Sequence, residues 1–238
     1  MNDHQSFQRF AALAAIISFP LALVSMVLSS MATDFNMDAT TNLAFWLPWL
    51  SAGADAARLL RWAMMLDMFS YYLPLLPVAL FLWRWLRSRS PNWILFYTSC
   101  GLGYILIGAI GAVILAAVHP PLINAYAQAT VEQRYVLETV FRTIWNMVYR
   151  GIWSILDELL VGVWFLGIGL LLRGEQRLFS IFSIILGISA LLGWLGIILD
   201  IEALALLGAI YGLLVPVWAL WLGIDLVRKP VQIQTADN

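Results

Sequence analysis

The residues of this chain with the clearest chemical potential are acids that stand where a membrane-spanning helix should be apolar. Only 14 uncharged residues, Leu159 to Leu172, separate Glu158 from Arg173. At ~1.5 Å of rise per residue this stretch reaches ~21 Å, whereas the hydrocarbon core of a bilayer is ~30 Å thick. If the segment spans, Asp157 and Glu158 must lie inside the membrane or at its edge, and carboxylates at such depth mark functional sites by default.

Asp67 repeats this arrangement in an earlier apolar segment, since only 16 uncharged residues separate it from Arg84. A six-helix topology brings these acids to one level near the outer ends of helices two and four, so we expect them to approach one another. Arg150 is the expected cationic neighbour, because a buried charge must be paired and its long side chain can fold toward a carboxylate two turns away. The predicted ligand-binding residues are Asp67, Arg142, Arg150, Asp157 and Glu158. The alternative is that these charges lie among lipid headgroups with the bilayer locally thinned.

The sequence offers no motif for catalysis, for a metal or for a cofactor. His119 is the only histidine apart from His4, and no spacing resembles a zinc motif such as H-E-x-x-H. We find no nucleophile elbow, phosphate loop or dinucleotide fingerprint. No catalytic residue or metal ligand is predicted, the cofactor is unknown, and His119 is expected to be a helix cap or a surface residue.

Composition excludes a soluble protein. The 238 residues are 62% hydrophobic and 11% charged, with a mean hydropathy of +0.86. The net charge of −1 offers no basic surface for nucleic acid. We predict an all-α polytopic membrane protein, a single domain covering residues 1–238 and built as a bundle of six transmembrane helices. The expected spans are 10–33, 62–83, 93–118, 152–172, 178–199 and 203–224.

Basic residues predict the orientation. Eight lie on the side of the bundle that holds both termini and five on the other side. By the positive-inside rule both termini are cytoplasmic, in a multi-pass protein of the inner membrane.

The segment before the fourth span has helical periodicity, with apolar residues spaced i, i+4, i+7 from Leu137 to Val148. We therefore predict an outer amphipathic extension of helix four, running from about Val131 to Leu172. His119-Pro120-Pro121 is expected to end helix three, because proline disfavours a helical predecessor. Residues 45–50, FWLPWL, are expected to form an interfacial aromatic anchor.

Small residues and prolines predict close contacts within the bundle. Gly208 and Gly212 form a GxxxG pair, which allows helices to approach closely. Four prolines inside spans are expected to kink them: Pro20, Pro74, Pro77 and Pro216. Residues 72–78 (YLPLLPV) and 211–217 (YGLLVPV) also align without gaps, although apolar segments resemble one another easily.

The layout resembles a family of uncharacterised bacterial six-helix integral membrane proteins. The resemblance rests on the long first outer loop, on Leu170-Leu171-Leu172-Arg173 before a short basic turn, and on residues 215–223, VPVWALWLG, near the end of helix six. The family pattern also places an Arg and a Glu within helix three, where this chain has no charge. The resemblance implies the six-helix topology and no particular reaction or substrate.

Three classes of function fit these patterns. The favoured one is non-enzymatic: binding or passage of a small polar or amphipathic ligand through a polar intramembrane pocket that opens outward. A second is a membrane enzyme acting on a lipid or isoprenoid, with Asp67, Asp157 and Glu158 as acid, base or metal ligands. A third is an accessory subunit of a larger membrane complex. The expected partners are membrane lipids, the small ligand, and a membrane-protein partner or a second copy of the chain.

Overall fold

The computed structural model describes residues 3–35 and 46–228, and these residues form helices and turns without a strand. In chain order the helical elements are α1 (Asp3–Ala32), α3 (Leu47–Leu50), α4 (Gly53–Asp67), η1 (Met68–Tyr72), α5 (Leu75–Leu86), α6 (Pro91–Gln128), α7 (Val131–Trp145), η2 (Asn146–Asp157), α8 (Glu158–Leu172), α9 (Arg177–Leu199) and α10 (Glu202–Arg228). The elements η1 and η2 are π-helical, whereas the others are α-helices.

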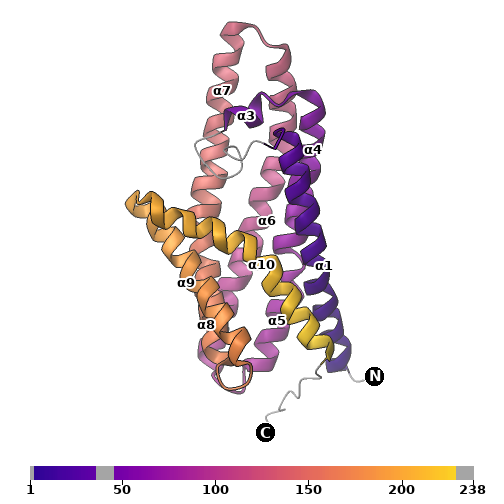
Figure 1. Ribbon diagram of the computed structural model, residues 1–238, viewed down its shortest axis with the longest axis vertical. Helices are drawn as coiled ribbons and strands as arrows, with labels where there is room; N and C mark the ends of the chain where they lie inside the picture. The colour runs from indigo at the N-terminus through magenta and orange to yellow at the C-terminus, as the bar shows by residue number, and fades with distance from the viewer. Residues whose placement is uncertain (1–2, 36–45, 229–238) are drawn as a thin grey trace.

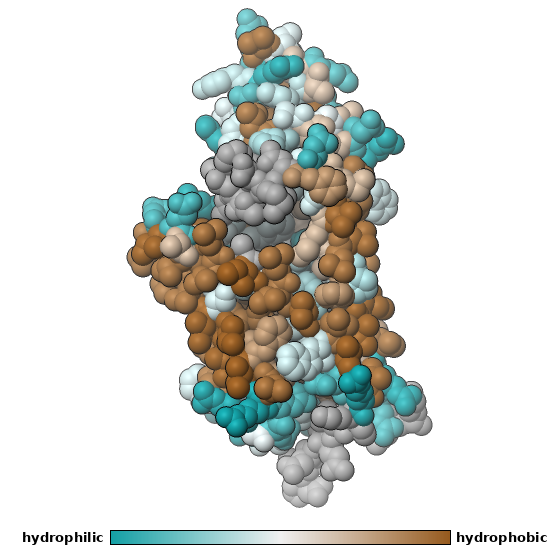
Figure 2. Space-filling model, in the orientation of Figure 1, coloured by the Kyte–Doolittle hydropathy of each residue, from teal (hydrophilic) through white to brown (hydrophobic). Residues whose placement is uncertain are grey.

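Six helical stretches are long and apolar enough to cross a membrane, which confirms the all-α six-helix class. They are His4–Ala32, Gly53–Leu86, Pro91–Gln128, Val131–Leu172, Arg177–Leu199 and Glu202–Arg228. Figure 2 shows hydrophobic side chains gathered in a broad zone between two hydrophilic ends of the molecule. The chain is therefore a multi-pass membrane protein.

The six stretches form a closed ring in which each packs on its neighbours in the chain. α1 packs on α4, α4 on α6, α6 on α8, α8 on α9 and α9 on α10, and α10 returns to α1. The start of α1 meets the end of α10, where Gln8 Nε2 donates a 2.7 Å hydrogen bond to the Leu226 carbonyl. We call this the terminal end; at the opposite, distal end the α6–α7 hairpin projects farthest (Figure 1).

The second span changes helix type where Pro74 interrupts it. Proline has no N–H, so the Ser70 carbonyl four residues earlier loses its intrahelical donor. Ser18 Oγ of α1 donates to this carbonyl at 2.5 Å, and Tyr104 Oη of α6 donates to the neighbouring Tyr71 carbonyl at 3.0 Å. The interruption therefore links the second span to α1 and α6, because each of these helices donates a hydrogen bond to one of its carbonyl groups.

The predicted extension of helix four is confirmed. Residues Val131–Leu172 are one continuous helical stretch that includes α7, η2 and α8. Thr130 caps its start with a capping box that includes Gln133. Within it η2 runs for 12 residues, and Ser154 Oγ donates to the Tyr149 carbonyl five residues earlier at 2.8 Å.

The expected end of helix three at His119 was wrong. Helix α6 continues through Pro120 and Pro121 to Gln128. His119 is 1% exposed, and its ring stacks on Phe141 with centroids 4.5 Å apart. Packing between α6 and α7 holds the helical path, so it outweighs the local preference of the residue before proline. His119 is thus a core residue and not a cap.

The segment predicted to form an aromatic anchor packs partly on the bundle, and its position at a bilayer interface stays a prediction. Phe45 lies outside the described residues, but Leu47–Leu50 forms the short helix α3, in which Trp49 and Leu50 are buried. The Trp49 ring lies 5.5 Å from the Trp145 ring. This segment covers an aromatic cluster of α6 and α7 at the distal end, because Trp49 packs against Trp145.

Candidate functional site

Asp157 and Glu158 are the most deeply buried acids among the described residues. They stand at the junction of η2 and α8 and are 1% and 8% exposed. Asp157 Oδ1 and Glu158 Oε2 have no hydrogen-bond partner within residues 3–35 and 46–228. Consecutive helical residues point ~100° apart, so the two carboxyl groups meet different neighbours. We call these two residues, with the tyrosines described below, the carboxyl site.

Glu158 lies in a niche formed by glycines of α9 and α10. A Cβ added to Gly193 would lie 2.6 Å from the Gly208 Cα and 2.8 Å from Glu158 Oε2. A Cβ added to Gly208 would overlap the Glu158 carboxyl group, while one added to Gly212 would meet nothing within 4 Å. Only Gly208 of the GxxxG pair therefore serves close approach, and it makes room for a carboxyl group.

Three buried tyrosines from three other segments lie in the region of Asp157, and one of them contacts it. Tyr211 Oη of α10 donates to Asp157 Oδ2 at 3.4 Å, which is a long hydrogen bond. Tyr72 of η1 and Tyr104 of α6 lie within electrostatic range of Asp157, and their ring centroids are 5.2 Å apart. All three are buried. Within the described part of the chain the site therefore combines one phenolic donor with two buried carboxyl oxygens that have no hydrogen-bond partner.

Sequence reasoning did not select these tyrosines as site residues, although one signal existed. The two aligned segments, 72–78 and 211–217, each begin with a tyrosine of the site. Gly108 accommodates Tyr72, because a Cβ there would overlap its ring. Gly108 of α6 and Gly208 of α10 thus mark where a bulky or polar side chain approaches a helix backbone.

Asp67 lies in the neighbourhood of the carboxyl site but makes no direct contact with it. It is half-buried at the end of α4, immediately before η1, and lies within electrostatic range of Asp157. No hydrogen bond or ion pair of its carboxyl group joins it to Asp157 or Glu158. A ligand-binding role for Asp67 stays a prediction.

Arg150 is not the cationic neighbour of the acids. Its Nη2 lies 2.8 Å from Oδ1 of Asp200 in the α9–α10 turn, and the two side chains are 54% and 83% exposed. Seven residues make nearly two turns of α-helix, but the wider turns of π-helical η2 bring Arg150 and Asp157 to different faces. The pairing also leaves the guanidinium exposed, which avoids the cost of burying it inside the bundle.

Arg142 lies still farther from the acids, exposed on α7 in the distal extension. In the described part of the chain no arginine, lysine or histidine forms an ion pair with Asp157 or Glu158. Residues 3–35 and 46–228 contain no group of three His, Cys, Asp or Glu side chains that could hold a metal ion. The carboxyl site therefore has acceptors and no cation of its own among these residues.

Both acid-bearing spans change to π-helix next to their acids. Asp67 precedes η1, and Asp157 is the last residue of η2. Such i→i+5 segments are rare inside α-helices and frequently occur at functional sites. The two interruptions bring Tyr72 and Asp157 into the same region of the ring.

Comparison with known proteins gives a family and no activity. A family model described as "Domain of unknown function (DUF4386)" matches residues 49–229, about three quarters of the chain. That region includes every residue of the carboxyl site. No curated protein and no solved structure matches the chain.

Proposed function

We propose that this chain, which belongs to the DUF4386 family of unknown function, binds a small polar or amphipathic ligand at the carboxyl site and holds it for passage or sensing. The observation that carries the proposal is the pair of buried acceptors, Asp157 Oδ1 and Glu158 Oε2, for which the described residues provide no hydrogen-bond partner. Buried polar groups in proteins are nearly always hydrogen-bonded, so each exception requires a reason. A ligand that donates hydrogen bonds to these two oxygens would explain why they lack partners.

The energetics favour a ligand role over a role in folding. An unsatisfied buried acceptor costs about 1–3 kcal/mol, and a charged group costs more. Buried acids that served only to hold helices together would be expected to have a cation of the chain beside them. Among the described residues, Asp157 accepts a hydrogen bond from Tyr211 at the long distance of 3.4 Å. A donor group of the ligand would offset the cost of both acids, which supports binding at this position.

The carboxyl site is expected to open toward the outer leaflet, with both termini cytoplasmic. Cysteines replacing Arg87 and Gln176, at the terminal end, should be labelled only from the cytoplasmic side. One replacing Asn124, at the distal end of α6, should be labelled only from outside. The reverse pattern would invert the orientation and the side from which the ligand enters.

Ligand binding is tested by the thermal stability of the purified protein in detergent against a panel of small amines, amides and amphipathic compounds. A ligand that binds only the folded state raises stability by RT ln(1 + [L]/Kd), which is about 2.7 kcal/mol at 100 times Kd. At least one chemical class should stabilise the wild-type chain and fail to stabilise Asp157→Asn and Glu158→Gln.

Asp55→Asn is the matched control, because Asp55 is exposed and pairs only with Arg58 of the same helix. This variant should respond to ligands as the wild type does. If Asp157→Asn and Glu158→Gln are stabilised by every compound that stabilises the wild type, the carboxyl site is not the binding site.

A further inference from the structure

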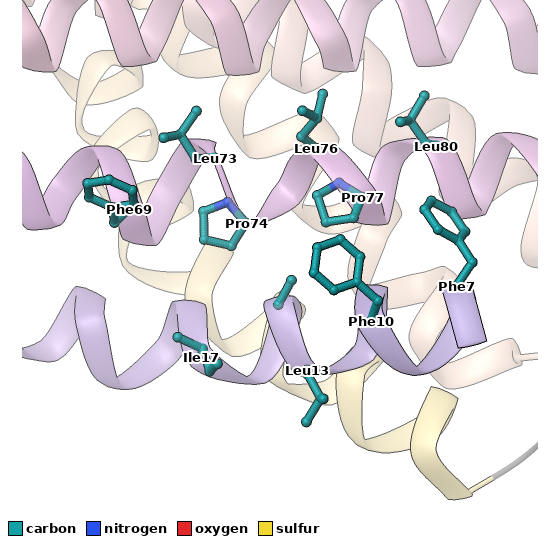
Figure 3. A pocket seen from close by; sticks show the side chains of 11 residues that line it. Phe7, Phe10, Leu13, Ile17, Phe69, Leu73, Pro74, Leu76, Pro77 and Leu80 are labelled. Carbon is teal, nitrogen blue, oxygen red and sulfur yellow. The ribbon is translucent and has the colours of Figure 1, made fainter. Parts of the chain in front are cut away.

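An apolar groove lies between α1 and the η1–α5 segment on the outer face of the ring. It encloses about 600 Å³ and is lined by Phe7, Phe10, Leu13, Ala14, Ile17, Phe69, Leu73, Pro74, Leu76, Pro77 and Leu80. Phe10, Leu13 and Ile17 are more than half exposed, so the groove opens to the surroundings of the bundle. Figure 3 shows Phe10 facing Pro77, with both proline rings directed toward α1.

Short side chains create the hollow. Ala14 lines the groove from α1 with only a methyl group. Pro74 and Pro77 project little from the other helix, while Phe7 and Phe69 lie at the two ends of the groove. Pro74 also interrupts the helix at η1. The groove is therefore a consequence of the same interruption that positions Tyr72 at the carboxyl site.

The length and position of the groove fit one leaflet of a bilayer. From Phe7 to Ile17 the helix rises ~15 Å, half of the ~30 Å hydrocarbon core. Phe7 stands near the terminal end, where Trp83 lies in the last turn of α5 and Trp93 in the first turn of α6. Tryptophans gather at the level of lipid headgroups, so the groove extends from that level toward the middle of the membrane.

A cationic group lies at the headgroup end of the groove. Cζ of Arg84 lies 4.9 Å from the centroid of the Phe7 ring, and Phe7 lines the groove. Within the described ranges Arg84 forms no ion pair with a carboxylate. Arg87 follows within one turn, exposed over Trp83. Positive charge at one end of the apolar groove is complementary to a lipid with an anionic headgroup.

We infer that this groove is a binding site for an anionic phospholipid, with one acyl chain between α1 and α5 and the phosphate beside Arg84. The apolar contacts alone give little selectivity, because lipid tails are as apolar as the side chains of the groove. Preference for this lipid therefore comes from the arginine, and its location comes from the groove. The site is separate from the carboxyl site and does not depend on the function proposed there.

The test is native mass spectrometry of the full chain, delipidated in detergent and titrated with dioleoylphosphatidylglycerol or dioleoylphosphatidylcholine. The wild type should bind the first phosphatidylglycerol more tightly than the first phosphatidylcholine. Arg84→Gln should reduce this preference about fivefold, as expected for one basic residue at a membrane surface. Arg84→Lys should keep most of it, and Arg61→Gln, exposed on α4 away from the groove, should leave it unchanged.

Blocking the groove separates a seated acyl chain from general attraction to positive charge. Ala14→Phe should weaken the first binding event for both lipids, and Leu76→Trp, at a 41% exposed position of the wall, should do the same if Ala14→Phe does not fold. Leu106→Trp, at a 63% exposed position of α6, should have no effect. Equal binding of the two lipids by the wild type, an unchanged preference in Arg84→Gln, or unchanged binding in the groove-blocking variants would overturn the inference.

Discussion

Two polar regions lie inside the same ring of helices and differ in whether their hydrogen-bonding groups are satisfied. At the η1 interruption, the Ser70 and Tyr71 carbonyls accept hydrogen bonds of 2.5 and 3.0 Å from Ser18 and Tyr104. At the carboxyl site, Asp157 and Glu158 each keep a buried oxygen without a hydrogen-bond partner in the part of the chain that the structure describes. The first region joins helices, whereas the second leaves acceptors in place for something outside the chain.

Removing both donors from the η1 interruption should have the largest effect on stability. Ser18→Ala with Tyr104→Phe leaves two buried carbonyls without partners, which should lower the free energy of unfolding by about 3 kcal/mol. Reversible unfolding in mixed micelles measures this. Ser99→Ala is the control, because its hydroxyl bonds only within its own helix and is exposed. An unfolding free energy within 0.5 kcal/mol of wild type, about the spread expected of neutral surface changes, would show that the interruption is not held by these bonds.

Alanine substitutions at the two glycines of the GxxxG pair should change the stability of the protein in opposite directions. Gly208→Ala places a methyl group against the Glu158 carboxyl and should cost about 1–2 kcal/mol. Gly212→Ala meets nothing within 4 Å and should stabilise by up to about 1 kcal/mol through helix propensity.

The origin of the Gly208 effect can be checked by a double-mutant cycle. In a Glu158→Ala background the cost of Gly208→Ala should disappear, because the group it meets is gone. Additive effects would mean that Gly208 serves helix packing alone and that its contact with Glu158 does not contribute to stability.

Replacing a buried acid that lacks a partner should preserve or raise the stability of the protein, whereas breaking a satisfied hydrogen bond lowers it. Asp157→Leu removes a buried carboxyl that has no cation among the described residues, so the ligand-free protein should be as stable as wild type or about 1 kcal/mol more stable. Ligand-dependent stabilisation should be lost at the same time. A loss of several kcal/mol in the ligand-free protein would instead show that Asp157 is part of the structural framework.

Arg150 should show the smallest effect. Its pair with Asp200 is largely exposed, and such pairs contribute about 0–1 kcal/mol. Arg150→Ala should therefore change the unfolding free energy by about 0.5 kcal/mol or less, and raising the salt concentration should remove even this difference. Thermal unfolding at two ionic strengths measures both quantities. A decrease of about 3 kcal/mol in the unfolding free energy would instead support the buried pair of Arg150 and Asp157 that the sequence suggested.

The six-helix class was predictable because it depends on long apolar stretches, which tertiary contacts do not change. The burial of Asp157 and Glu158 followed from the short span that begins at Leu159. The partner of Arg150 was not predictable, since it depends on a π-helical register that no sequence pattern announces. The prediction that helix three ends at His119 failed for a related reason. Contacts between α6 and α7 outweigh the local preference of the residue before Pro120.

The site residues missed from the sequence share one cause. Gly208 looked like a helix contact, and its role beside Glu158 emerges only when α8, α9 and α10 are placed together. Tyr104 gave no local signal, because a tyrosine in an apolar helix usually serves packing. Charge and span length can therefore point to the acids, while the groups around them require the three-dimensional arrangement.

The most direct test of the carboxyl site as a binding site is an experimental structure of the protein extracted in its native lipid. We predict density that belongs to no protein atom within hydrogen-bonding distance, about 2.5–3.2 Å, of Asp157 Oδ1 and Glu158 Oε2. That density should be absent from Asp157→Asn prepared in the same way. Both acids bonded to side chains of the chain itself, or both turned outward to lipid headgroups with no such density, would contradict the account.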